Sequence, residues 1–195
     1  MKSNGDVRSI LLAGVGGQGI LRASDILCHV TMEAGLDVKK SEVHGMAQRG
    51  GCVTSHVRYG NKVYSPLARK GDVDILVSFE KLETLRYLDF LRPGGGLIIS
   101  EREIYPPSVN LGDAAYPDNI IEIVEKIFKI VKVANAYNIA LKAGDARTEN
   151  TALLGVLSSY LRQLDISLWE KVIRGSFPKK AIEVNLKAFH MGRTV

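Results

Sequence analysis

Short apolar runs alternate with segments of helical periodicity along the first two thirds of the chain. The apolar runs, which are typical of parallel strands buried on both faces, lie within 8–13, 74–79, 97–100 and 129–134. Apolar residues recur with the spacing of an amphipathic helix at 18–33, 80–91 and 120–127. A strand, a helix and a second strand in this order imply a right-handed crossover between parallel neighbours. The pattern therefore predicts an α/β protein.

Two further strand candidates interrupt this simple alternation. Residues 36–43 form the second strand candidate, and 52–59 alternate in polarity. One side of the latter would carry Val53, Val57 and Tyr59, and the other Thr54, His56 and Arg58. Gly60-Asn61 then predicts a tight hairpin turn into 62–64. Such a hairpin would add an antiparallel element, so we expect a mixed, mostly parallel sheet.

The last third of the chain is helical in pattern. A helix is predicted over 148–164, Ser167 to Glu170 has the form of a capping box, and Pro178 suits the first turn of a last helix that Gly192 ends. The proline-containing stretch 105–117 predicts a surface loop. We expect one domain over 1–195, with a Rossmann-like α/β core at 1–134, flanked by helices, and a helical extension at 135–195.

Composition narrows the class of protein. The chain is 46% hydrophobic and 24% charged, as ordinary globular proteins are. Cys28 and Cys52 fit neither a metal spacing nor a disulfide framework, which indicates reduced thiols and a cytoplasmic protein. No apolar run reaches the ~18 residues that a membrane span needs. The net charge of +5 is scattered and not interleaved with aromatic residues, so we expect no nucleic-acid partner.

The first segment with chemical content is a glycine turn between a predicted strand and a predicted helix. Gly14, Gly16 and Gly19 satisfy G-x-G-x-x-G, and Gln18 could add a side-chain amide. The pattern suits a dinucleotide, a phosphate of another cofactor, or a tight turn with a purely structural role. A dinucleotide site also needs an acid at the end of the second strand. Asp37 comes at its start and Glu42 abuts another loop, so the fingerprint is incomplete.

That other loop, 44–51, is the second segment with chemical content. His44, Gln48 and Arg49 could bind a carboxylate, a phosphate or a carbonyl oxygen, and the glycines at 45, 50 and 51 would let the chain fold back. The alternatives are a surface or capping role for His44 and a salt bridge for Arg49, to Glu42 or to a partner chain. We expect both glycine segments to open onto one edge of the sheet. No nucleophile elbow, Walker lysine or metal-ligand cluster accompanies them.

Together the two segments resemble the gamma-type domain of the 2-oxoacid:ferredoxin oxidoreductases. The turn at 14–19 looks like the opening turn of that family, and 42–51 is most similar to the form in the small (beta) subunits of its indolepyruvate branch. The C-terminal stretch 181–192 is similar to the last helix of the family, and Asn150 with Leu154-Gly155 is similar to the helix before it. The resemblance spans nearly the whole chain.

The resemblance implies a subunit of a complex that decarboxylates 2-oxoacids oxidatively, forms acyl-coenzyme A and reduces ferredoxin. It implies an alpha subunit as partner, which carries thiamine diphosphate and the [4Fe-4S] clusters, and no tightly bound cofactor, metal or catalytic residue on this chain alone. The predicted cofactor-binding residues are Gly14, Gly16, Gly17, Gln18, Gly19, His44, Gly45, Gln48, Arg49, Gly50 and Gly51. Two other hypotheses stay open: a free-standing NAD(P)- or FAD-dependent Rossmann oxidoreductase, and a non-catalytic assembly subunit.

Overall fold

A computed structural model describes residues 7–45 and 51–195, and within them six strands form one sheet of order β2-β3-β1-β4-β5-β6. The strands are β1 (Arg8–Val15), β2 (Asp37–His44), β3 (Cys52–Gly60), β4 (Val73–Ser78), β5 (Leu91–Ser100) and β6 (Ile130–Ala134). β1, β4, β5 and β6 pair in parallel, whereas β3 is antiparallel to both β1 and β2. The predicted mixed, mostly parallel sheet is confirmed.

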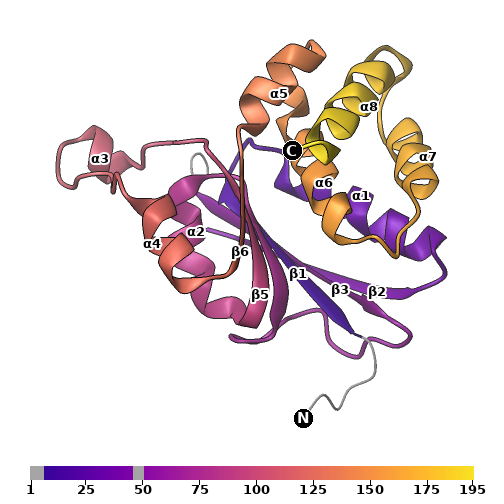
Figure 1. Cartoon of the computed structure of the whole chain (residues 1–195), viewed down its shortest axis with the longest axis horizontal. Coiled ribbons are helices and arrows are strands. Elements are labelled where there is room, and N and C mark those ends of the chain that lie inside the picture. The colour runs from indigo at the N-terminus through magenta and orange to yellow at the C-terminus, as the bar shows by residue number, and fades with distance from the viewer. Residues whose placement is uncertain (1–6, 46–50) are drawn as a thin grey trace.

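Helices cover both faces of this sheet (Figure 1). They are α1 (Ile20–Glu33), α2 (Lys81–Tyr87), α3 (Pro107–Asn110), α4 (Ile120–Ile127), α5 (Ala136–Ala143), α6 (Glu149–Tyr160), α7 (Ile166–Ser176) and α8 (Lys179–Arg193). One face packs against α1 and α6, on which α7 and α8 pack in turn, and the other face packs against α2 and α4. None of the helices described here has the length and apolar character that a bilayer span requires.

The antiparallel element differs from the one expected. Residues 62–64 form no strand, and β3 is joined instead to β2 through the connection at 45–51. Side chains hold the stretch after β3: Asp37 accepts the Val63 N–H at 2.8 Å, and Arg58 donates to the Ser65 carbonyl at 3.0 Å. The hairpin predicted at Gly60-Asn61 is therefore wrong, because side-chain hydrogen bonds replace the ladder that a hairpin would need.

Several helix boundaries also differ from the prediction. α2 ends at Tyr87, and a 3-10 turn (Leu88–Phe90) leads directly into β5. Asp165, not Ser167, caps α7, because its carboxylate accepts the Ser167 N–H at 2.8 Å. Pro178 is the N-cap of α8, one residue before the helix begins, and Gly192 lies inside the helix.

Gly155 of α6 and Gly192 of α8 let these two helices cross in backbone contact. A Cβ atom at Gly155 would lie 2.1 Å from the Phe189 carbonyl oxygen, and one at Gly192 would lie 2.0 Å from the Ala152 carbonyl oxygen. Any larger side chain would force the helices apart. Phe189, which stacks on Trp169 at a centroid distance of 5.7 Å, fills the adjoining core. Gly192 therefore serves helix packing and does not end the helix.

Candidate functional site

The glycine turn follows β1 at the edge of the sheet where the parallel strands end. Gly14 is buried, and a Cβ atom there would lie 2.7 Å from the Phe79 Cβ atom. Gly19 has φ +76°, and a Cβ atom would lie 2.6 Å from the Asn150 amide nitrogen. Gly16 and Gly17 are exposed, and nothing lies within 4 Å of a Cβ atom at Gly17. Gly14 and Gly19 thus serve packing, whereas the main chain at Gly16 and Gly17 is exposed.

Gln18 bridges the ends of β1 and β4. Its Oε1 atom accepts the Val15 N–H at 2.8 Å, and its Nε2 atom donates to the Phe79 carbonyl at 2.6 Å. The helix after β1 lies on one face of the sheet and the helix after β4 on the other, so the topology switches between these strands. A ligand of an open α/β sheet ordinarily enters at such a point. Here both ends of the Gln18 amide already bond within the chain.

The second glycine segment begins and ends beside the first. The Gly45 N–H donates to the Cys52 carbonyl at 2.8 Å, which closes the base of the connection between β2 and β3. The Gly16 N–H donates to the Gly51 carbonyl at 3.0 Å, and Val15 lies opposite Cys52 in the sheet. The two segments therefore meet at one edge, as the sequence predicts.

The predicted binding residues of the second segment are placed only in part. His44 ends β2, where its Cα pairs with that of Val53. Gln48, Arg49 and Gly50 lie outside the described residues, which stop at Gly45 and resume at Gly51. Ligand binding by this segment stays a prediction.

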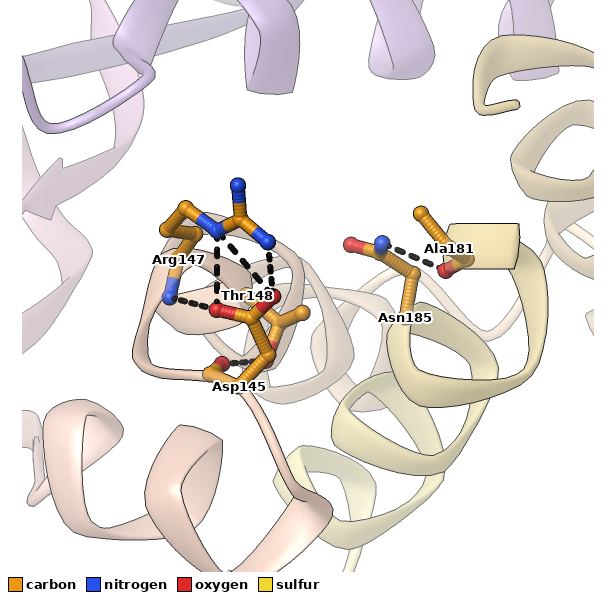
Figure 2. Close-up of polar contacts among 5 residues, drawn as sticks. All are labelled: Asp145, Arg147, Thr148, Ala181 and Asn185. Carbon is orange, nitrogen blue, oxygen red and sulfur yellow. Dashed lines mark hydrogen bonds and ion pairs between the residues drawn. The ribbon is translucent and has the colours of Figure 1, made fainter. Parts of the chain in front are cut away.

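A chain of buried polar side chains ties the glycine turn to the C-terminal helices. The Asn150 amide donates to the Gly19 carbonyl at 3.2 Å, and its oxygen accepts the Thr151 N–H at 2.8 Å. The Thr151 hydroxyl donates to the Asn185 amide oxygen at 2.7 Å. The Asn185 nitrogen donates to the Ala181 carbonyl at 2.8 Å, as Figure 2 shows. The C-terminal helices, which also resemble the family, thus fix the position of the glycine turn.

The C-terminal ends of β4 and β5 carry polar residues at the same edge, which sequence reasoning did not single out. The Ser100 hydroxyl lies 3.3 Å from the Glu149 carboxylate, and the Arg102 guanidinium lies 4.1 Å from the centre of the Tyr137 ring. Burial raises the pKa of Glu149, against the opposing effects of Arg102 and the Ser100 hydroxyl. The available signal was a polar residue directly after each buried strand, as at Ser100 and at Glu80.

An ion pair just before α6 has a structural role. Arg147 forms a forked pair with Asp145, with distances of 3.0 and 2.6 Å, and the pair holds the pKa of Asp145 at about 2 (Figure 2). Asp145 also accepts the Arg147 N–H at 2.9 Å, which caps the 3-10 turn (Ala146–Thr148) before α6. Both charges are satisfied within the turn, so the pair needs no ligand.

The exposed main chain at Gly17, together with the N-terminus of α1, fits an anionic group better than a nucleophile or a metal, whereas the Gly16 N–H is taken by the Gly51 carbonyl. Open N–H groups at a helix start attract phosphate or carboxylate. By contrast, burial raises the pKa of the Cys28 thiol to about 12, so it stays protonated. Within 7–45 and 51–195, no group of three or more His, Cys, Asp and Glu side chains is arranged to hold a metal.

These features define the class: a Rossmann-like α/β subunit whose glycine-lined edge is held by a C-terminal helical bundle. The family model described as "Pyruvate ferredoxin/flavodoxin oxidoreductase" matches residues 9–195. The chain belongs to this family, and the predicted membership of the 2-oxoacid:ferredoxin oxidoreductases is confirmed.

Relatives and solved structures agree with this assignment. The chain is 41% identical to "Indolepyruvate oxidoreductase subunit IorB" of Pyrococcus horikoshii, over 94% of this chain and 93% of the relative. It is 42% identical to the protein of the same name from Archaeoglobus fulgidus, over 94% and 92%. The crystal structure of pyruvate oxidoreductase subunit PORC from Thermotoga maritima shares the fold, with a TM-score of 0.74 at 22% identity over 97% and 96% of the two chains.

Proposed function

We propose that this chain is the small, non-thiamine-binding subunit of an indolepyruvate:ferredoxin oxidoreductase. The complex would decarboxylate aryl pyruvates oxidatively, form the acyl-coenzyme A and pass electrons to ferredoxin. The main structural support for this proposal is the hydrogen bond from the Gly16 N–H to the Gly51 carbonyl, which brings the two glycine segments together at one exposed edge of the sheet. Relatives named as indolepyruvate oxidoreductase subunits, similar over 94% of this chain, support the substrate class.

The partner in this proposal is an alpha subunit that holds thiamine diphosphate and the [4Fe-4S] clusters. Thiamine diphosphate supplies the carbanion stabilisation that decarboxylation needs. The present chain contributes the wall that faces this centre. The exposed main chain at Gly17, and the anion-binding side chains predicted at His44, Gln48 and Arg49, would orient an anionic group such as the phosphates of coenzyme A.

Gln18 has a different role in this proposal from the one predicted. Because its amide already bonds to Val15 and Phe79, it would fix the turn and not touch the cofactor. Gly14 and Gly19 act in the same way, through their close contacts with Phe79 and Asn150.

The structure disfavours the free-standing dinucleotide enzyme. The acid that would hold a ribose at the end of the second strand is Glu42, and its carboxylate lies 2.6 Å from the Lys40 ammonium. Asp37, at the other end of β2, accepts the Val63 N–H. A titration of the isolated chain with NAD(P) and FAD is expected to show no binding.

Co-expression with an alpha-type partner tests the proposal. The pair is expected to reduce viologen in the presence of indolepyruvate and coenzyme A, and neither chain alone is expected to do so. Phenylpyruvate, pyruvate and 2-oxoglutarate, run in parallel, define the branch. Turnover by the lone chain, or no turnover by the pair, would contradict the proposal.

Arg49→Ala separates a ligand role from mere assembly. The variant is expected to raise the KM for coenzyme A about tenfold, the effect of losing one charge-assisted contact, while the complex still forms. Arg69→Ala is the matched control, because that side chain is 92% exposed and precedes β4 at the opposite edge of the sheet. Equal kinetics in both variants would favour the non-catalytic assembly role.

A further inference from the structure

The segment between β5 and α4, residues 101–119, forms an arm that projects from the body of the molecule (Figure 1). The arm contains the short helix α3 near its tip. It leaves the sheet at Ser100, the end of β5, on the same edge as the two glycine segments. A molecule that binds at this edge of the sheet would therefore lie next to the arm.

A buried carboxylate anchors the base of the arm. Glu80 is only 1% exposed and accepts the Ile104 N–H at 3.2 Å and the Tyr116 hydroxyl at 2.5 Å, one from each limb of the arm. The Tyr105 and Tyr116 rings then pack against each other at 5.1 Å. Because a buried carboxylate is costly unless it is fully hydrogen-bonded, this anchor fixes the direction in which the arm leaves the body.

The tip of the arm is folded on its own. The Leu111 N–H donates to the Pro107 carbonyl at 2.9 Å, the Asp113 N–H to the Ser108 carbonyl at 2.8 Å, and the Asn110 amide to the Tyr105 carbonyl at 3.0 Å. Among the residues that the structure describes, the hydrogen bonds of 106–115 are all made inside the arm. The tip is thus ordered without support from the rest of the chain.

The surface of the arm is apolar at its tip and acidic along its length. Leu111 is 77% exposed and Tyr105 is 50% exposed. Residues 101–119 contain four carboxylates and one arginine, a net charge of −3 in a chain whose total is +5. A projection that carries an exposed leucine and a local charge opposite to that of its own chain is suited to a partner of complementary charge.

We propose that this arm docks on the partner subunit that completes the reaction centre, with Leu111 in an apolar pocket rimmed by basic residues. The choice of partner rests on the proposed function: the subunit that covers the glycine-lined edge also meets the arm, because both extend from the same edge of the sheet. The anchor at Glu80 holds the arm ready before the partner arrives, which lowers the entropy lost on binding.

Leu111→Glu tests the contact. The dissociation constant of the chain for the alpha-type subunit, measured by titration calorimetry, is expected to rise at least about 30-fold, as for the loss of a central apolar anchor. Leu111→Met is expected to stay within about threefold, because it keeps an apolar side chain of similar volume. The matched control is Ile127→Glu, at a side chain 62% exposed at the far end of α4, where about twofold or less is expected.

The outcomes separate this inference from the proposed function. Equal affinities for Leu111→Glu and Ile127→Glu, with an active wild-type complex, would overturn the arm contact and leave the function intact. A wild-type chain that neither binds the alpha-type subunit nor supports turnover would overturn both. If light scattering shows that Leu111→Glu changes only the self-association of the lone chain, the arm binds a second copy and the proposal is wrong. Circular dichroism and thermal unfolding confirm that each variant is folded.

Discussion

The two faces of the sheet hold the candidate site by different chemistry. Under α1, α6, α7 and α8 lies the larger apolar cluster, where two helices touch backbone to backbone at Gly155 and Gly192 and Asn150 bonds to the glycine turn. Under α2 and α4 the apolar cluster is smaller, and beside it the buried Glu80 carboxylate anchors the arm. Close packing and neutral amide hydrogen bonds locate the glycine turn, and a buried carboxylate locates the arm. The glycine-lined edge of the sheet is therefore fixed from both faces of the sheet by contacts within this chain.

The first test of this comparison removes the close helix packing. Gly155→Ala is expected to lower the free energy of unfolding by about 3–5 kcal/mol or to prevent folding, because the new Cβ atom would overlap the Phe189 carbonyl oxygen. Gly175→Ala is the control: Gly175 lies in α7 with no atom within 4 Å of its Cβ position, and a gain of about 0.5–1 kcal/mol is expected. Urea unfolding measures both. Equal stabilities would show that α6 and α8 do not cross as described.

The second test removes the polar anchor on the other face. Glu80→Ala is expected to cost about 2–3 kcal/mol, because it leaves the buried Glu83 and Ile104 N–H groups without their acceptor. Hydrogen exchange is expected to accelerate in 101–119 and not in α6 or α8. Glu101→Ala, at an exposed carboxylate on the same arm, should change neither quantity. Unchanged exchange in the Glu80 variant would contradict the anchor.

The third test loosens the glycine turn itself. Gln18→Ala is expected to cost about 1–2 kcal/mol, since the Val15 N–H and the Phe79 carbonyl lose their partners. In the reconstituted complex the KM for coenzyme A should rise through displacement of Gly16 and Gly17. A variant of normal stability with altered coenzyme A kinetics would instead place Gln18 in contact with the ligand.

The smallest expected effect concerns His56 on β3. Burial, and to a lesser degree Arg58, lowers the pKa of His56 from its usual 6.5. The unfolded chain therefore takes up the proton first, so this group lowers stability as the pH falls below 6.5 and has no such effect above it. His56→Gln is expected to reduce the loss of stability between pH 6.5 and about 5 by less than about 1 kcal/mol. The same pH dependence in both proteins would contradict this expectation.

Local sequence patterns predict the helices and strands, whereas contacts between residues far apart in the sequence determine the roles of individual side chains. The buried strands and the meeting of two glycine segments at one edge follow from apolar runs and chain order. The hairpin at Gly60-Asn61 failed because Asp37, distant in sequence, captures the Val63 N–H. Gly192 was misread for a similar reason: its contact with Ala152 exists only after folding. The bond from Gln18 to Phe79 likewise joins residues far apart in the sequence.

The anchor at Glu80 shows the same limit most clearly. A glutamate after a strand is ordinarily a helix cap, which it is here for α2. Its second role depends on Ile104 and Tyr116, which no periodicity brings near it. Polar residues at the ends of strands can be recognised in the sequence as candidate site residues, but their hydrogen-bond partners cannot.

Hydrogen exchange of this chain, measured with and without the alpha-type subunit, tests whether the partner covers the glycine-lined edge together with the arm. Binding is expected to slow exchange at 14–19, at 42–53 and at 101–119, and to leave α7 and the exposed side of α8 unchanged. Protection confined to α7 and α8, with the glycine-lined edge still exchanging freely, would contradict it.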